Sequence, residues 1–148
     1  MTDRWPGFKV IDEVGRAAIW EGVLAPDKRE HLVRVRYRVP LVLEDLTLHD
    51  VQPRVQVIKP LLEAHADYEQ GPIPHVYWSK ACPTTPYLCL FSPSNREWDP
   101  TDLIAQTTIF WAAEWLYFYE GWLVTKKWRG GGRHPQQLGE GEKRLETV

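Results

Sequence analysis

The chain has 148 residues, of which 43% are hydrophobic and 26% are charged. This composition is typical of a soluble globular protein and excludes a disordered or fibrous chain. The formal net charge is −2, so the chain lacks the strong basic excess of a nucleic-acid-binding protein. At this length we expect one domain with one hydrophobic core.

The N-terminal stretch MTDRWPGFKVIDEVG predicts no secretory signal, because it lacks a basic start followed by an apolar run. We therefore expect a cytoplasmic protein with both of its thiols reduced. The most apolar stretch, IFWAAEWLYFYEGWLV, is interrupted by Glu114 and Glu120. A membrane-spanning helix needs about 20 apolar residues that are nearly free of charge, so no transmembrane segment is predicted.

The first part of the chain predicts a short helix followed by two strands. Residues 3–17, DRWPGFKVIDEVGRA, are weakly helical in pattern. The run AIWEGVLAP at 18–26 is rich in strand formers and ends at a proline, which favours a first strand. The run HLVRVRYRVP at 31–40 has a clean period of two, which predicts a second strand. One face of this second strand carries Val33, Val35, Tyr37 and Val39, and the other carries Arg34, Arg36 and Arg38.

The arginine face has two interpretations. It is either a solvated strand face, balanced by acidic residues elsewhere, or a surface that binds a polyanion. The solvated face is the one we expect. After an irregular stretch, the run PRVQVIKP at 53–60 predicts a third strand bracketed by prolines, and three successive strands indicate an antiparallel meander. Residues 61–71 predict a helical turn or a loop.

A long helix is predicted from about residue 100 to residue 124. Asp99 is placed to cap its N-terminus, with Pro100 at the first helical position and Asp102 in the first turn. Its apolar residues occupy more than one side, so we expect it to be buried on more than one side. Gly130, Gly131 and Gly132 are expected to end it. We therefore expect a domain over residues 1–128 and a glycine-rich loop with a polar tail over 129–148.

The spacing of the chemically reactive residues argues against metal and hydrolytic sites. Cys82 and Cys89 lie seven residues apart, and His75 lies seven residues before Cys82. This is not the paired spacing of a structural zinc site, so we expect no metal and no cofactor. The chain has no G-x-S-x-G turn and no phosphate-binding glycine loop. The residues alone leave each cysteine either a small buried hydrophobe or a nucleophile.

The order of the motifs resembles that of the ubiquitin-conjugating enzymes over roughly residues 15–125. That family places a His-Pro-Asn tripeptide, an aromatic residue, a cysteine between apolar residues and a Trp-x-Pro in this order, followed by a long helix. The matching positions here are Pro74, His75, Val76 and Tyr77, then Cys89, then Trp98 with Pro100. The chain departs from the family at Ile73, which replaces its His, and at His75, which replaces its Asn.

A bacterial subgroup is more similar still. PHVY, LCLF and the helix sequence, with the segment from Gly130 to Pro135, look like the ubiquitin-conjugating-like proteins of anti-phage operons (CBASS) that are encoded beside a cyclic-oligonucleotide synthase. The resemblance implies an α+β fold with a short N-terminal helix, an antiparallel meander of three or four strands and a long helix packed across the sheet.

The same resemblance implies a function and a site. It makes Cys89 the thioester-forming nucleophile and Cys82 a spectator, and it gives His75 the part of a residue that organises the active-site loop or stabilises an oxyanion. The implied partner is the synthase, bound through its C-terminus. The chain shows no ATP-binding motif, so a separate activating enzyme is expected.

Two rival functions remain open at this point. One is a non-catalytic module that docks on and regulates the synthase through its Trp-rich helix, since Trp is enriched in interface hot spots. The other is an interfacial membrane protein that uses the same helix, although we expect neither a membrane nor a nucleic acid as partner. The candidate docking residues are Trp98, Trp111 and Trp115.

Overall fold

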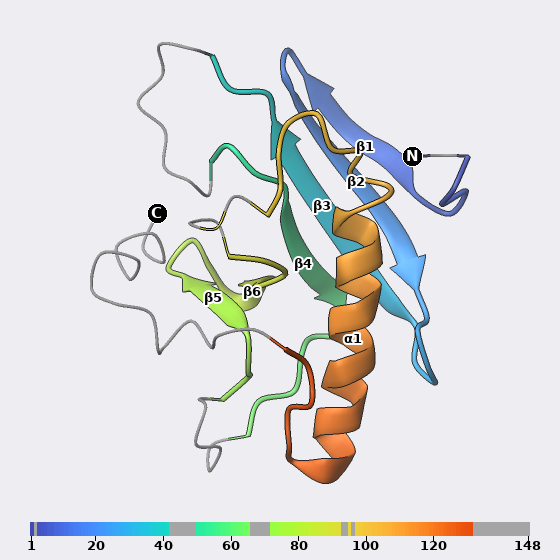
Figure 1. The fold of residues 1–148 in the computed structure, drawn as a ribbon, viewed down its shortest axis with the longest axis vertical. Helices are drawn as coiled ribbons and strands as arrows, with labels where there is room; N and C mark the ends of the chain where they lie inside the picture. Colours follow the sequence, from blue (N-terminus) through green and yellow to red (C-terminus); the bar gives the residue numbers. More distant parts are fainter. Residues whose placement is uncertain (2, 42–49, 66–71, 93–94, 96, 132–148) are drawn as a thin grey trace.

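One antiparallel sheet packs against one long helix, as the α+β prediction expects (Figure 1). The computed structural model describes residues 1, 3–41, 50–65, 72–92, 95 and 97–131. Within these residues the sheet has six strands in the order β1-β2-β3-β4-β6-β5. The elements are β1 (Lys9–Val14), β2 (Ala17–Leu24), β3 (His31–Arg38), β4 (Arg54–Lys59), β5 (Val76–Ser79), β6 (Cys82–Leu88) and α1 (Thr108–Thr125).

The three predicted strands are confirmed as β2, β3 and β4, which form consecutive antiparallel pairs. Val33 and Val35 of β3 are fully buried, whereas Arg36, which follows Val35, is exposed. Arg34 pairs with Glu21 on β2 at 2.6 Å, with the two side chains 33% and 20% exposed. The alternation therefore separates a core face from a solvated face, although Val39, beyond the end of the strand, is 50% exposed.

The predicted N-terminal helix is wrong, because residues 9–14 form the edge strand β1. All six residues of β1 are exposed, so this strand has no buried face whose period of two a sequence pattern would reveal. Gly15 has a positive φ of 59° in the two-residue turn that joins Val14 to Ala17. Such a turn suits glycine, and it folds β1 back onto β2 as a hairpin.

The predicted count of three or four strands is also too low, because the cysteine-rich stretch forms the β5–β6 hairpin. Its two strands meet at a two-residue turn between Ser79 and Cys82. Pro83 and Pro86 hide β6 from sequence analysis, since proline cannot donate to a ladder and is unusual in an inner strand. The pairing of β6 with β4 is correspondingly short, with Gln56 opposite Tyr87.

Helix α1 begins later than predicted. Asp99 caps a local turn instead of the helix, because its carboxylate accepts bonds from the backbone N–H and the hydroxyl of Thr101, at 2.9 and 2.7 Å. The helix starts after Thr107, without a side-chain cap, and ends with Lys126 in the left-handed conformation (φ 59°). The glycines from 130 onward therefore do not terminate it.

Residues 61–65 form a loop. Residues 66–71 and 132–148, which include part of the predicted loop and tail, lie outside the described residues.

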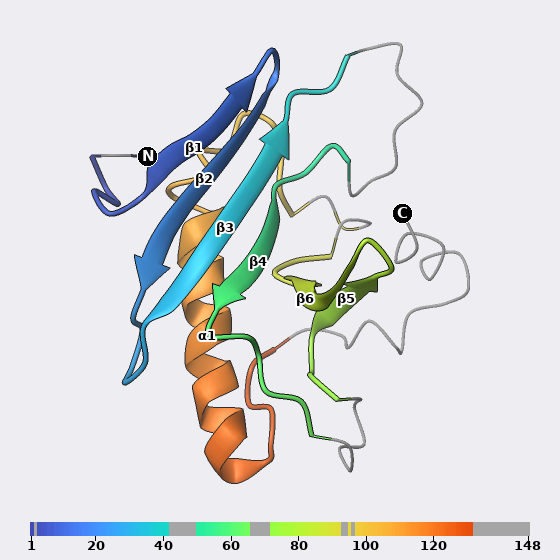
Figure 2. The same cartoon turned by 180° about the vertical axis from the view of Figure 1, so that it is seen from behind.

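The hydrophobic core lies between the helix and one face of the sheet (Figures 1 and 2). Helix α1 contributes its inward side, where several residues are 0–4% exposed, and the sheet contributes the valines of β3 and β4. The helix therefore packs across the sheet as predicted. Its core residues are Ile109, Ala112, Trp115, Leu116, Tyr119 and Trp122.

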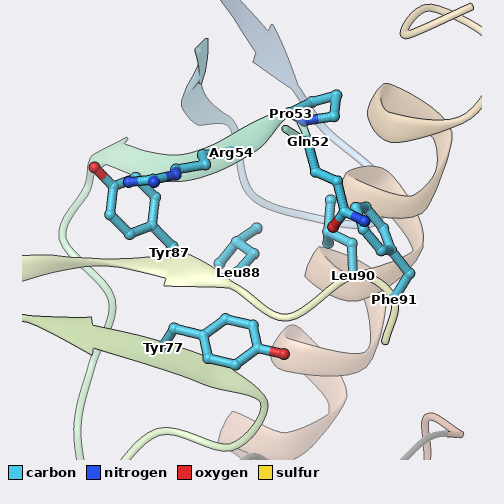
Figure 3. A pocket seen from close by; sticks show the side chains of 8 residues that line it. All are labelled: Gln52, Pro53, Arg54, Tyr77, Tyr87, Leu88, Leu90 and Phe91. Carbon is cyan, nitrogen blue, oxygen red and sulfur yellow. The ribbon is translucent and has the colours of Figure 1, made fainter. Parts of the chain in front are cut away.

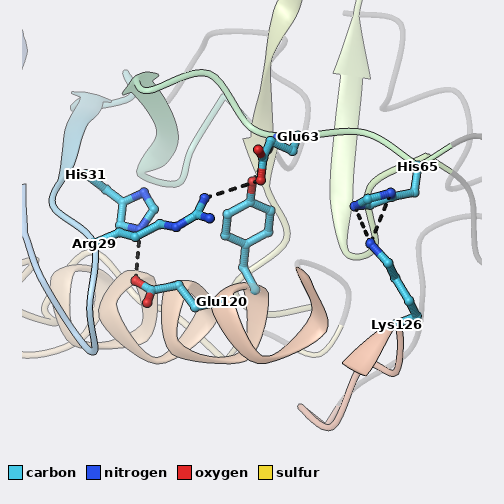
Figure 4. Close-up of polar contacts among 7 residues, drawn as sticks. Arg29, His31, Glu63, His65, Glu120 and Lys126 are labelled. Atoms are coloured by element: carbon cyan, nitrogen blue, oxygen red, sulfur yellow. Dashed lines mark hydrogen bonds and ion pairs between the residues drawn. The ribbon is translucent and has the colours of Figure 1, made fainter. Parts of the chain in front are cut away.

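Polar contacts fix the C-terminal half of α1 to the sheet and its loops (Figure 4). Glu120 on α1 pairs with His31 at the start of β3 at 3.0 Å, with side chains 6% and 1% exposed, and it also accepts the backbone N–H of Lys28 at 3.0 Å. The Tyr119 hydroxyl accepts the backbone N–H of Glu63 at 2.7 Å. Burial raises the pKa of Tyr119 from its ordinary value. These bonds set the rotation of the helix on the sheet.

We expect that replacing Arg34, Arg36 and Arg38 together by Gln will lower the free energy of unfolding by about 1 kcal/mol or less, since part-exposed ion pairs contribute little. Val35→Ala is the control from the same strand, and it should cost about 2 kcal/mol or more because it leaves a cavity in the core. Urea denaturation measures both. Loss of cooperative unfolding in the triple variant would contradict the assignment of the solvated face.

Candidate active site

Cys89 directly follows β6, where the strand leaves the sheet. Its backbone N–H donates to the carbonyl of His75 at 2.9 Å, which extends the β5–β6 pairing by one step beyond Val76 and Leu88. Its side chain is half-buried, and its Sγ lies 3.3 Å from the Tyr77 hydroxyl. Its Sγ also lies 4.0 Å from the carbonyl oxygen of Phe91, so the part-exposed residue has polar neighbours on both the hairpin and the chain that follows it.

The backbone of His75 is the junction of the site. Its carbonyl accepts the Cys89 N–H and also the indole N–H of Trp115, from the middle of α1, at 3.0 Å. His75 itself has a φ of 52°, a left-handed conformation that Asn adopts more readily than most residues. His75 therefore holds a backbone conformation that few side chains tolerate, and Asn, the family's residue at the matching position, is one that tolerates it.

The imidazole of His75 is covered by the chain that returns from the helix. Trp128 stacks on this ring with centroids 5.0 Å apart and an interplanar angle of 25°, and it also contacts Trp115 and Phe118. His75 is 6% exposed as a result. Gly130 permits this return, because a Cβ there would lie 2.7 Å from the Trp128 indole nitrogen. Opening the His75 side chain to a substrate requires Trp128 to move.

A small pocket lies next to the segment that carries Cys89, because Leu88, Leu90 and Phe91 line it (Figure 3). Tyr77 and Tyr87, on neighbouring strands, both line it, and their hydroxyls point in opposite directions. The guanidinium of Arg54 lies over the Tyr87 ring at 5.3 Å from its centroid. The pocket is mostly apolar, and its walls are Gln52, Pro53, Arg54, Tyr77, Tyr87, Leu88, Leu90 and Phe91.

Cys82 is remote from this site. It begins β6, at the hairpin turn, whereas Cys89 follows its end. Cys82 pairs with Ser79, and Cys89 lies opposite His75. The two cysteines are therefore separated by about four residues along β5, roughly 13 Å, which is beyond the reach of a disulfide. The nearest polar group recorded for Cys82 is the Tyr87 hydroxyl, 4.0 Å from its Sγ. The fold thus separates the two thiols and places only Cys89 beside His75 and Tyr77.

The three candidate docking tryptophans lie in different surroundings. Trp98 and Trp115 are each 4% exposed and belong to the core, so neither offers a surface without rearrangement. Trp98 packs edge-on against Tyr37 at 5.3 Å. Trp111 is part-exposed and packs against Phe91, two residues after Cys89, with centroids 5.4 Å apart. Of the three, only Trp111 combines exposure with proximity to the thiol.

Two ionisable groups close to Trp98 have shifted pKa values, namely Asp99 and Tyr37. Hydrogen bonds from Thr101 lower the pKa of Asp99. Burial, with a smaller effect of the Asp99 carboxylate, raises the pKa of Tyr37.

Among the described residues no cluster of three or more His, Cys, Asp or Glu could hold a metal ion. In the same part of the chain, no helix is both long enough and apolar enough to span a membrane.

Residues 1–135 match the family model of the type II CBASS E2 protein. The chain belongs to the type II CBASS E2 family. A search of curated proteins finds no match. The family confirms the resemblance to the conjugating-like proteins of CBASS anti-phage defence that the motifs PHVY and LCLF indicate.

In this type II CBASS E2 protein, sequence analysis missed two residues of the site. The resemblance matches Tyr77 only to the tripeptide region, yet its hydroxyl lies 3.3 Å from the Cys89 Sγ. The contact follows from the hairpin register, in which Tyr77 and Cys89 are diagonal neighbours on one face, and the sequence did not predict this hairpin. Trp128 gave no signal, since its stacking on His75 depends on the path of the chain after α1.

We expect Tyr77→Phe to slow alkylation of Cys89 by iodoacetamide several-fold, because the hydroxyl can donate a hydrogen bond to the thiolate. Tyr87→Phe is the matched control, since its hydroxyl lies near Cys82 instead. Mass spectrometry of the Cys89 peptide against time gives both rates. Equal rates in Tyr77→Phe and the wild type would show that this hydrogen bond has no effect on the thiolate.

Proposed function

We propose that this protein is an acyl-transfer enzyme in which Cys89 forms a thioester with the C-terminal carboxyl of a partner protein. The observation that supports this proposal most is the position of the half-buried Cys89 thiol, at the end of β6 and beside Tyr77 and His75. In sequence, Cys89 also matches the thioester-forming cysteine of the ubiquitin-conjugating enzymes. Membership of a CBASS family makes the cyclic-oligonucleotide synthase the proposed partner.

The proposed acyl transfer has two steps, formation of the thioester and its attack by an amine. The Cys89 thiolate attacks the carbonyl carbon of a C-terminus that a separate enzyme has activated, a C–S bond forms, and the activating group leaves with its electron pair. An amine then attacks the same carbon, a C–N bond forms, and the thiolate leaves while the amine loses its proton to solvent. Cysteine suits both steps, because its thiolate is a good nucleophile and a good leaving group.

The neighbours of Cys89 have separate roles in this proposal. The Tyr77 hydroxyl, 3.3 Å from Sγ, stabilises the thiolate before attack. The His75 carbonyl fixes the Cys89 backbone, and its imidazole donates to the developing oxyanion once Trp128 has moved. The part-exposed pair of Phe91 and Trp111 forms the edge on which the partner's C-terminal segment rests. In the defence system, attachment of the synthase would prime or regulate it.

The rival is a docking module without chemistry. The burial of Trp98 and Trp115 weakens the version of it that relies on a tryptophan surface. If the protein is a docking module, Cys89→Ala should retain full regulation of the synthase and Trp111→Ala should lose it. If the protein is an acyl-transfer enzyme, Cys89→Ala should abolish regulation.

We expect wild-type protein, mixed with the synthase and the enzyme that activates its C-terminus, to form an adduct that hydroxylamine cleaves. Cys89→Ala should give no adduct. Cys89→Ser should give an adduct that resists thiol reductants, because an alkoxide is a poorer leaving group than a thiolate. Denaturing gels measure all three.

Cys82→Ala is the matched control, and its adduct should equal that of the wild type. An adduct that survives Cys89→Ala and disappears in Cys82→Ala would refute the assignment of the nucleophile.

His75 can be tested through its two roles separately. His75→Asn should preserve the fold, because Asn accepts the left-handed conformation, whereas His75→Ala should lower the free energy of unfolding by about 1 kcal/mol. If the imidazole also serves the oxyanion, His75→Ala should slow transfer by roughly 10²- to 10³-fold, far more than its stability loss explains. Thermal melts and single-turnover transfer rates separate the effects. Unchanged stability and unchanged rate in His75→Ala would exclude both roles.

A further inference from the structure

The outward side of α1 carries a row of large apolar side chains that the active site does not use. Phe110 is 52% exposed, Tyr117 56% and Val124 84%. They are spaced seven residues apart, so they drift by only about 20° per step around the helix and lie on one side. We call these three residues the outer stripe. The core-facing residues of α1 occupy the opposite side.

Gly121 lies next to the outer stripe, and no contact among the described residues requires a glycine there. It is exposed, and a Cβ added to it would meet nothing within 4 Å. A glycine inside a helix costs about 1 kcal/mol relative to alanine. The missing side chain leaves room for another helix to approach. In a second copy packed here, the exposed Glu114, which lies on the other side of Tyr117, is the residue that would come closest to Gly121.

The spacing of the outer stripe is symmetric about Tyr117, because Phe110 and Val124 lie seven residues before and after it. Two copies of α1 that cross antiparallel at Tyr117 therefore place Phe110 of each against Val124 of the other. Such a contact uses the same patch twice, as a two-fold dimer requires.

Charge favours the same orientation. No lysine or arginine occurs between Glu97 and Thr125, and the described acidic residues before the helix are Glu97, Asp99 and Asp102. The chain after the helix is basic, with Lys126, Lys127 and Arg129. An antiparallel pair brings the acidic end of one copy to the basic end of the other and opposes the two helix dipoles, whereas a parallel pair places like charges together.

We infer that the outer stripe binds a second copy of this chain as an antiparallel, two-fold helix pair centred on Tyr117. One helix face per copy buries less surface than a standard stable interface. The dimer is therefore a reversible one, with a dissociation constant on the order of 1–100 μM.

Cysteine cross-linking tests the geometry in the full chain with Cys82→Ser and Cys89→Ser. Tyr117→Cys should form a disulfide-linked dimer on mild oxidation, because it lies on the two-fold axis. Phe110→Cys alone should not, since its two copies lie about 21 Å apart along the helix axis. A mixture of Phe110→Cys with an affinity-tagged Val124→Cys should give the mixed dimer. Absence of both the Tyr117 dimer and the mixed dimer, or equal self-linking at all three positions, would overturn the inference.

Sedimentation velocity tests the association without cross-links. Tyr117→Lys should weaken self-association at least tenfold. Val10→Lys, on a β1 residue that is 51% exposed, is the matched control and should leave self-association unchanged. A wild-type chain that stays monomeric at several hundred micromolar contradicts the proposal. So does a monomeric chain whose binding to the synthase, or to anionic vesicles in a flotation assay, is lost in Tyr117→Lys, because the stripe would then serve that partner.

Discussion

The carbonyl oxygen of His75 is the point on which the candidate site depends. It accepts one hydrogen bond from the Cys89 backbone and one from the Trp115 indole, so it ties the end of the β5–β6 hairpin to the middle of α1. A buried carbonyl with two donors is expensive to disturb, since each lost bond leaves a desolvated polar group. The left-handed conformation of His75 turns this carbonyl toward both donors. The position of the nucleophile is therefore set by backbone geometry.

Helix α1 serves two sides of the molecule. Its inward side provides the core, and its C-terminal return brings Trp128 over the His75 ring. The buried pair of His31 and Glu120 fixes the helix against the sheet near its C-terminal end. Because these contacts determine the rotation of the helix, they also determine that Trp115 faces the active site and that the outer stripe faces away from the core.

The sequence predicted the elements whose burial has a regular period. Strand β3 alternates between fully buried valines and arginines that are exposed or part-exposed, and its pattern was readable. Strand β1 is exposed throughout, and β6 contains two prolines, so neither showed the pattern of its structure. In the candidate site, motif order pointed to Cys89 and His75. The contacts of Tyr77 and Trp128 depend on cross-strand register and on the path of the chain after α1, which local sequence does not encode. Residue type identified the tryptophans but not which of them are buried.

The central claim is that Cys89 carries the acyl group. Tandem mass spectrometry of the adduct formed by the unaltered chain, digested under mildly acidic conditions that preserve thioesters, tests it most directly. The account predicts that the peptide containing Cys89 carries the C-terminal peptide of the synthase, with the loss of one water, and that the linkage disappears with hydroxylamine. A linkage mapped to Cys82 or to a lysine of this chain, with the Cys89 peptide unmodified throughout the time course, would contradict it.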